Sequence, residues 1–373
     1  MNDRERFRAC MTFQAVDRMP RWEWGFRSDT TSRWYGEGLP ASVPDTVGWA
    51  QYFGLDRGCG YANGAMAERL NVNVELLPGF ENAVIEEDDR TVLSRNRWGA
   101  LTRSSKVGQS IPQYLSFGVR TRDDLRKYRS AWDAAAPQRY PADWDDRKRR
   151  WRGRDFPVAG WTYGWYGLLR ELMGVEELSV AFHEDEALID EVCEFWGDFI
   201  IQAFHRALVE ATPDYVLFWE DLAFKTGPPL SPRHFRRFFL PHYKRVIEDF
   251  RRHGVTLFMV DSDGNINDII PLWIEAGVNI LAPFEVAAGM DVVQVGRQYG
   301  RDLAMIGGVD KMEVAKGRLA MEAEVWRHVV PLLDRGGYIP TLDHAVLPET
   351  SLGDYRNYLS HLRSTCESGK GQP

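Results

Sequence analysis

The sequence predicts an α/β protein that folds as a (β/α)8 barrel, with a helical extension at its N-terminus and an irregular inserted region. Three observations lead to this prediction. Several short apolar segments end in acidic residues or glycine, predicted strands alternate with predicted helices from residue 156 onward, and 44% of the 373 residues are hydrophobic. Such a chain can bury one large core, and repeated strand–helix units favour a parallel sheet.

The clearest strand is 256–260, an apolar segment that runs directly into Asp261, Ser262, Asp263 and Gly264. A short run of this kind is typical of a strand buried on both faces in a parallel sheet. Four further strands end in a similar way: 215–219 before Glu220 and Asp221, 279–284 before Glu285, 303–306 before Gly307, Gly308 and Asp310, and 338–342 before Asp343 and His344. Because α/β folds place their chemistry at the carboxyl ends of parallel strands, these side chains are expected to share one site.

The N-terminal part of the chain is less regular. An amphipathic helix is expected at 3–13, and a first strand at 21–27. The segment 29–155 has few clean periods, so we expect it to be the insertion-rich part of a single domain, 1–373. Within this segment, a hairpin is expected at 91–105 and surface helices at 121–151.

The C-terminal part begins with a strand at 156–163 and then alternates. Ser231 followed by Pro232 predicts a helix start, and Pro241 is expected to kink that helix. The other expected helices lie at 168–173, 186–210, 266–276, 289–299, 321–335 and 351–365.

Composition limits the partners. A net charge of −8 argues against nucleic acid and against an anionic membrane surface. The four cysteines show neither CxxC spacing nor a disulfide framework, which is typical of a reducing compartment. No signal-peptide pattern and no apolar stretch of about 18 residues is present, so we expect a soluble, cytoplasmic protein without a membrane partner.

Four segments together resemble the uroporphyrinogen decarboxylase superfamily, which contains the decarboxylase of haem biosynthesis and corrinoid-linked methyltransferases. They are Arg4-Glu5-Arg6-Phe7 through Val16-Asp17-Arg18-Met19-Pro20, then Leu230-Ser231-Pro232 through Pro241, then Gly307-Gly308-Val309-Asp310, and Asp343-His344-Ala345-Val346-Leu347-Pro348. The resemblance covers nearly the whole chain. It implies a (β/α)8 barrel with its site at the carboxyl ends of the strands, and a homodimer.

The departures from the family pattern are informative. The haem-pathway decarboxylase carries several arginines after its first strand to hold substrate carboxylates, and here at most Arg27 corresponds to them. Family methyltransferases carry His-x-Cys-Gly, whose His and Cys bind zinc, where this chain has Asp261-Ser262-Asp263-Gly264. The mouth of the barrel is therefore expected to be acidic, and haem synthesis is not expected.

Two chemistries suit these acids, because crowded carboxylates need a cation or a proton. In one, a divalent metal, with zinc favoured over manganese or iron, is held by Asp261, Asp263, His344, Glu220 and Asp221. In the other, a carboxylate of raised pKa is a general acid and His344 orients it.

Structural roles compete with both chemistries. Asp261 or Asp263 could cap the following helix, and Glu220 and Asp221 could pair with Lys225 or Arg233. Asp343 and His344 could form a hydrogen-bonded pair without a catalytic part.

Substrate contacts are expected from aromatic and glycine residues at the strand ends. Tyr163 matches a tyrosine that the resemblance places in the site, and an aromatic rim would suit an aromatic or methylammonium substrate, although core packing explains these rings equally well. Gly307 and Gly308 would form either a phosphate-binding turn or a plain tight turn. The expected catalytic residues are His344, Asp261, Tyr163 and Glu220, and the expected substrate-binding residues are Arg27, Trp22, Trp24, Trp161, Gly307 and Gly308.

Three functional hypotheses follow. The leading one is a metal-dependent, corrinoid-linked methyltransferase or demethylase of a small substrate, with methylcobalamin carried by a partner protein. The second is a decarboxylase or lyase of a small acid that uses Asp and His for proton transfer. The third is a barrel that binds a small molecule without catalysis.

Overall fold

The computed structural model describes residues 1–43, 46–61, 67–106 and 112–368. Its centre is a parallel sheet in which each strand pairs with the next along the chain. The strands are β5 (Ala159–Tyr163), β6 (Tyr215–Trp219), β7 (Phe258–Asp261), β8 (Ile280–Ala282), β9 (Ala304–Ile306) and β10 (Tyr338–Ile339). Single bridges add two extended segments, because Phe26 pairs with Val346 beyond β10 and Glu23 pairs with Gly60. This architecture confirms the predicted α/β barrel fold.

The barrel interior is a separate hydrophobic core. Along β6, Tyr215 and Leu217 belong to this interior core, whereas Val216 and Phe218 pack on the helix side. This is the alternation that a strand buried on both faces produces. Every strand of the sheet and both extended segments contribute: Trp22, Cys59, Ala159, Tyr215, Leu217, Met259, Ile280, Ala282, Ala304, Ile306 and Ile339. Phe7, Cys10 and Met11 of helix α1 (Asp3–Met11) pack against the same core.

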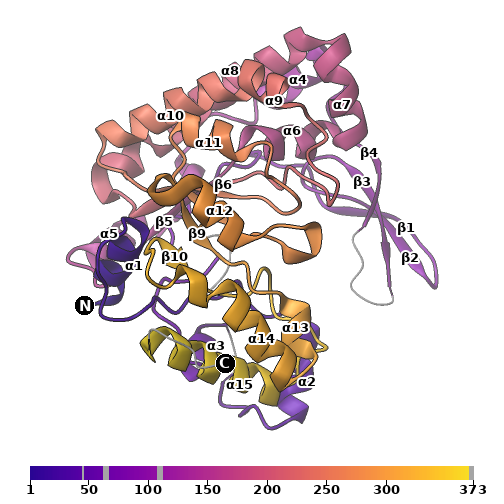
Figure 1. Ribbon diagram of the computed structural model, residues 1–373. Coiled ribbons are helices and arrows are strands. Elements are labelled where there is room, and N and C mark those ends of the chain that lie inside the picture. Colours follow the sequence, from indigo (N-terminus) through magenta and orange to yellow (C-terminus); the bar gives the residue numbers. More distant parts are fainter. Residues whose placement is uncertain (44–45, 62–66, 107–111, 369–373) are drawn as a thin grey trace.

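Helices cover the outside of the sheet (Figure 1), with α8 and α10 on one side and α14 and α15 on the other. The helices that follow β5 are α6 (Trp165–Met173), α7 (Val175–Glu184), α8 (Glu186–Ala211), α9 (Pro232–His234), α10 (Leu240–Arg252), α11 (Ile270–Ala276), α12 (Val292–Tyr299), α13 (Lys311–Ala315), α14 (Arg318–His328) and α15 (Leu352–Ser368). Ser231 caps α9 as predicted, since its hydroxyl accepts from His234 N. A π-helical turn at Phe235–Phe239 precedes Pro241, so regular helical hydrogen bonding is interrupted next to that proline. Within the described residues, no helix is both long and apolar enough to cross a membrane.

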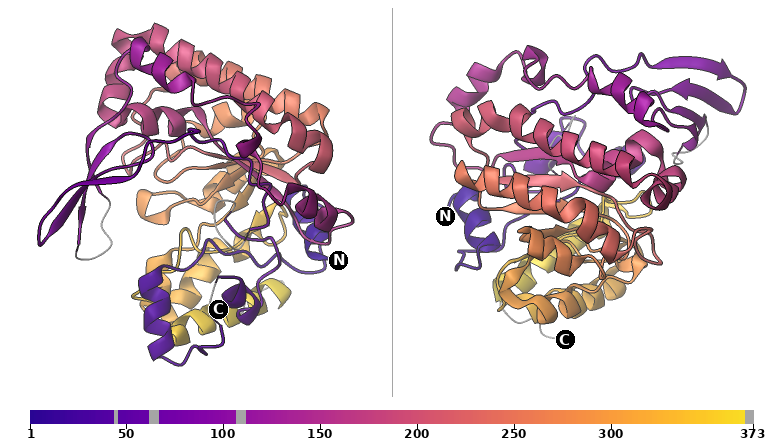
Figure 2. Two further views of the ribbon diagram at one scale, coloured as in Figure 1. Left: turned by 180° about the vertical axis from the view of Figure 1, so that it is seen from behind. Right: turned by 90° about the horizontal axis from the view of Figure 1, so that it is seen from above.

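The segment between the first strand and β5 holds a second, antiparallel sheet. Its strands, in spatial order, are β1 (Ala83–Glu87), β2 (Thr91–Arg95), β3 (Leu101–Ser105) and β4 (Gln113–Ser116). The β2–β3 pair is the predicted hairpin, and the sheet projects away from the barrel (Figure 2). The helices of this part are α2 (Ser28–Gly36), α3 (Thr46–Tyr52), α4 (Arg122–Arg129) and α5 (Trp144–Trp151).

Asp214, just before β6, holds the amino-terminal end of the barrel together. Its carboxylate has no exposed surface and accepts from Arg4 Nε at 2.8 Å, Arg8 Nη1 at 3.1 Å and Arg154 Nη2 at 2.8 Å. Val158 N, next to β5, also donates to it at 3.0 Å. Burial alone would raise the pKa of Asp214, but Arg154 and Arg4 bring it below its ordinary value. One carboxylate thus connects α1, β5 and β6.

Replacing Asp214 with alanine should therefore lower the free energy of unfolding by about 3–5 kcal/mol, because it leaves a buried guanidinium without its counter-charge. Urea denaturation measures this. The matched control is Asp123→Ala, which removes an exposed i,i+3 pair with Arg126 and should cost less than about 0.5 kcal/mol. Equal effects of the two substitutions would contradict the role given to Asp214.

Candidate active site

The carboxyl ends of the strands open into a cavity of about 310 Å3. Its lining comes from the two extended segments, β6, β7, β8 and the loop after β10. The lining residues are Trp24, Tyr61, Trp219, Asp221, Asp261, Asp263, Pro283, His344 and Ala345. Asp261, Asp263, Asp221 and His344, which were predicted to share a site, are therefore brought together.

Asp261 is the last residue of β7 and only 8% of it is exposed. It stands in register with Trp219 of β6 and Ala282 of β8. Burial raises its pKa to about 7, although a hydrogen bond from the Tyr61 hydroxyl works in the opposite direction. At neutral pH this carboxyl is therefore poised between its acid and its ionised form.

Asp263 lies two residues further on, with 36% of its side chain exposed. Burial and the neighbouring charge of Asp261 raise its pKa to about 8, with smaller contributions from Asp221 and Glu285. Gly264 then turns the chain at φ +81°, where a Cβ would meet Ala223 O at 2.1 Å. The capping alternative fails for both aspartates, because the next helix begins only at Ile270.

His344 faces Asp263, with 3.7 Å between Nε2 and Oδ2. Its Nδ1 accepts a hydrogen bond from Ala345 N at 2.8 Å, which assigns the proton of a neutral ring to Nε2. Burial and nearby Lys311 lower the pKa of His344 below its ordinary value, so the ring is neutral at pH 7. A neutral N–H donor is thus directed at a carboxyl of raised pKa.

Asp221 already has its own cation. Arg170 Nη1 lies 2.5 Å from its Oδ2 and 2.7 Å from its main-chain oxygen. The guanidinium of Arg170 also lies over the Trp219 ring, 5.2 Å from the centroid. The expected partners Lys225 and Arg233 are replaced by this arginine of α6.

Glu220 is placed outside the cavity. It directly follows Trp219, the last residue of β6, and its side chain points to the helix side of the sheet. There its carboxylate accepts hydrogen bonds from Trp165 N at 3.1 Å, Gly167 N at 2.7 Å and Tyr243 OH at 2.5 Å. A carboxylate so placed neutralises the N-terminus of α6 and is not available to a metal or a substrate. The catalytic and metal-binding role predicted for Glu220 is not supported by this position.

Asp343 is also committed, but not to His344. It is fully buried and accepts from Val286 N at 2.9 Å and from Lys311 Nζ at 3.1 Å. The structural alternative of an Asp343–His344 pair is therefore not formed, and Asp343 instead makes an ion pair with Lys311 beside the cavity.

The donor set does not fit a metal ion in this arrangement. In the part of the chain that the structure describes, no three His, Cys, Asp or Glu side chains lie close enough together to hold one. Two of the five expected ligands, Glu220 and Asp221, are occupied by amides and by Arg170. No mechanistic step is therefore assigned to a metal.

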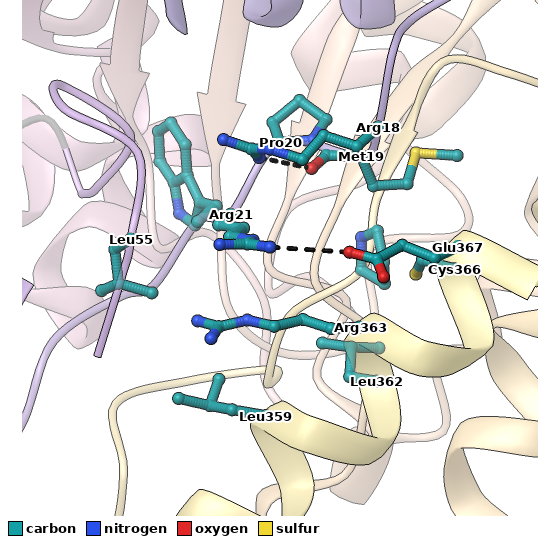
Figure 3. Close-up of a pocket in the computed structure, with 12 residues that line it drawn as sticks. Arg18, Met19, Pro20, Arg21, Leu55, Leu359, Leu362, Arg363, Cys366 and Glu367 are labelled. Carbon is teal, nitrogen blue, oxygen red and sulfur yellow. Dashed lines mark hydrogen bonds and ion pairs between the residues drawn. The ribbon is translucent and has the colours of Figure 1, made fainter.

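The predicted aromatic rim is only partly formed by the expected rings. Trp24 lines the cavity and donates from Nε1 to Leu342 O at 2.8 Å. Trp161 lines another recess of about 230 Å3, and buried Tyr163 packs between Trp161 and Trp219 at 4.8 and 5.5 Å. Trp22 belongs to the interior core and also borders a small crevice beside α15. Figure 3 shows this crevice, where Arg21 and Arg363 lie near Glu367.

The two glycines after β9 are explained by packing. Both have positive φ, and a Cβ would meet Pro283 O at 2.0 Å on Gly307 or Val292 Cγ1 at 2.2 Å on Gly308. Neither lines the cavity, so this position gives no support to a phosphate-binding turn. Arg27 pairs with Asp29 at 3.3 Å, and its charge contributes to the lowered pKa of His344.

Sequence reasoning missed four residues of the site: Tyr61, Trp219, Arg170 and Lys311. Tyr61 lies in the irregular segment, next to the single bridge that Gly60 makes with Glu23. Trp219 could have been found, since register with Asp261 places it on the same face of the sheet.

Comparisons with known proteins agree with this fold. A statistical model of the family described as "Uroporphyrinogen decarboxylase (URO-D)" matches residues 113–364. A uroporphyrinogen decarboxylase from Nocardia farcinica (strain IFM 10152) is 29% identical over 157 residues, which span 40% of this chain and 42% of that protein. Among solved structures, a methyltransferase from Methanosarcina mazei superposes with a TM-score of 0.62 at 15% identity, covering 98% of this chain and 99% of that one. A B12-independent methionine synthase from Shewanella sp. W3-18-1 gives a TM-score of 0.40 at 12% identity, with 94% and 93% covered.

The raised pKa of Asp261 should make the free energy of unfolding depend on pH. Between the ordinary value of about 3.8 and the folded value of about 7, the folded state binds more protons than the unfolded state. This contribution therefore makes the wild type lose stability as pH rises through that window, and Asp261→Asn should remove the loss. The difference in free energy of unfolding between variant and wild type should shift in favour of the variant by about 1–3 kcal/mol from pH 4 to pH 8.

Chemical denaturation at a series of pH values measures this difference. Asp268→Asn, on an exposed aspartate of the same loop, is the matched control and should show no such trend. A stability difference for Asp261→Asn that does not change with pH would contradict the assignment.

Proposed function

The chain belongs to the uroporphyrinogen decarboxylase family, and we propose that it is a methyltransferase-type member that demethylates a small substrate in the strand-end cavity. The methyl acceptor would be a corrinoid carried by a partner protein. One observation carries the proposal: three aspartates line the cavity, and no described lysine or arginine does. This lining therefore offers no described cationic side chain to hold an anionic ligand.

The acidic lining argues against the other reactions. A porphyrinogen bears many carboxylates and needs several guanidinium groups to hold them. A small carboxylate would likewise find no described cationic side chain in this lining, and its charge would oppose the ionisation of Asp261 and Asp263. Methyl transfer from nitrogen or oxygen needs no anionic substrate. The methyltransferase from Methanosarcina mazei has this fold over its whole length, which supports methyl transfer at the same barrel mouth.

The residues of the chain divide the work as follows. The bond between the methyl carbon and the substrate heteroatom breaks, and its electron pair stays on the heteroatom. When the leaving atom is the oxygen of an uncharged ether, Asp263, protonated at neutral pH in the free protein, gives its proton to that oxygen, and the Nε2–H of His344, 3.7 Å away, stabilises the carboxylate that results. An amine that leaves a methylated ammonium is already neutral and needs no proton. Trp24 and Trp219 line the cavity and limit the access of water.

The corrinoid, when bound, would supply the nucleophile that takes the methyl group. Because it would belong to a partner, this chain needs an opening towards it. The cavity is open to the outside beside Asp263 and His344, because 36% of the Asp263 side chain and 51% of the His344 side chain are exposed.

A methyl-transfer assay tests the proposal. Candidate N- and O-methyl substrates are mixed with free cob(I)alamin, and the loss of its absorbance is followed. With an O-methyl substrate, Asp263→Asn should lower the rate by about 10²–10⁴-fold, and the wild-type rate should fall as pH rises through about 8, where the acid form is lost. Asp268→Asn should keep the wild-type rate. Release of CO2 from small acids without any methyl transfer would contradict the proposal and favour a decarboxylase.

Metal content gives an independent check, because the sequence predicted a zinc, manganese or iron ion at Asp261, Asp263, His344, Glu220 and Asp221. Since these donors do not form a three-ligand group, protein purified without added metal should hold well under one equivalent. Elemental mass spectrometry measures this. One equivalent in wild type that disappears in Asp263→Ala/His344→Ala, but not in Asp268→Ala/His361→Ala, would restore the metal hypothesis.

A further inference from the structure

We infer that the cavity binds a methylated ammonium cation, whose positive nitrogen lies among the rings of Trp24, Tyr61 and Trp219 and beside Asp261 and Asp263. The inference rests on the proposed function only in making this amine the methyl donor. Binding of the cation needs neither a corrinoid nor turnover.

The first support is the aromatic part of the lining. Three rings from three different segments line one cavity of about 310 Å3, and the centroids of Trp24 and Tyr61 are 5.5 Å apart. The polar atoms of two rings are already used: Trp24 Nε1 donates to Leu342 O, and the Tyr61 hydroxyl bonds to Asp261. The rings are thus fixed in place, and ring faces attract cations that cannot donate hydrogen bonds.

Trp219 shows this attraction within the protein. The guanidinium of Arg170 lies 5.2 Å from its ring centroid while it pairs with Asp221. A cation is therefore already held by two residues of the lining, Trp219 and Asp221, although Arg170 itself does not line the cavity. A substrate ammonium would likewise lie between an aromatic ring of the cavity and the carboxylates of Asp261 and Asp263.

The second support is the charge balance. Arg170 is committed to Asp221 and Lys311 to Asp343. Among the described residues, no lysine or arginine pairs with Asp261 or Asp263, and Asp263 faces the neutral ring of His344. A monovalent cation from outside would favour the ionised forms of Asp261 and Asp263 and would supply the positive charge that those forms need.

An organic cation suits this cavity better than an inorganic one. A metal ion needs several oxygen or nitrogen donors converging at about 2 Å, and the described side chains form no such group. A methylated ammonium is bulky, has its charge spread over methyl groups and needs apolar faces. The cavity lies at the lower end of the size range of small-molecule sites and mixes apolar walls with a few polar groups.

Binding of choline, compared with its uncharged isostere 3,3-dimethylbutan-1-ol, tests the inference. The two molecules share one shape and differ in charge. Quenching of tryptophan fluorescence, checked by calorimetry, should saturate with choline at an affinity at least about 10-fold higher than with the isostere. Trp24→Leu should weaken choline binding by about 3- to 10-fold, whereas Trp326→Leu, on the exposed face of α14, should not change it.

A second pair of variants separates charge from shape. Asp263→Asn should weaken choline by about 10-fold and leave the isostere unchanged, and Asp268→Asn should affect neither. Circular dichroism melting confirms that each variant is folded. Equal affinity for choline and the isostere, no binding of either, or displacement of choline by one equivalent of zinc or manganese would overturn the inference.

The outcomes also distinguish this inference from the proposed function. Choline binding without methyl transfer from any amine would leave the cation site standing and contradict the proposed reaction. Methyl transfer from an uncharged ether, without choline binding, would support the reaction and overturn the cation site.

Discussion

The crowding of negative charge at the carboxyl ends of the strands is the constraint on which this site depends. Parallel strands deliver acidic residues to one edge, where they cannot all stay ionised unless each finds a partner. In this fold, each of three acidic residues has a different partner. Glu220 takes the amides at the N-terminus of α6, Asp221 takes Arg170, and Asp343 takes Lys311. Asp261 and Asp263 lie in the cavity with His344, and no lysine or arginine among the described residues pairs with either of them.

At the opposite end of the barrel, the acidic residues are paired with arginines. There, Asp214 accepts from three arginines of two segments, and Arg6 pairs with Asp17 through Nε at 2.7 Å. This pairing accounts for the N-terminal family segment, whose arginines and aspartates form a closed network below the interior core. The carboxylates there are matched by arginines, whereas Asp261 and Asp263 at the mouth pair with no described lysine or arginine. The ion pairs of the lower end contribute stability that offsets the cost of burying carboxyls without a cation at the mouth.

The sequence was sufficient for the barrel and for half of the site, and the failures have physical causes. Asp261, Asp263 and His344 follow buried strands, and parallel topology alone brings them together. Glu220 follows a strand in the same way, yet it points outward, because Trp219 is in register with Asp261 and the next residue must face the helices. That alternation is present in the sequence. Tyr61 is different: it comes from a segment with no periodic pattern, and only the folded chain places its hydroxyl on Asp261.

The charge of the proposed ligand follows from the residues that replace the family's arginines at the mouth. In the haem-pathway decarboxylase of the family, arginines at the mouth are implied to hold a substrate that is rich in carboxylates. Here the corresponding surface offers Trp24, Tyr61 and Trp219 beside two unpaired aspartates, and Arg27 is paired with Asp29. Replacing guanidinium groups by ring faces and carboxylates leaves the barrel intact but inverts the electrostatic preference of its cavity. The proposed methylated ammonium suits this preference, because it combines positive charge with a group that can be transferred.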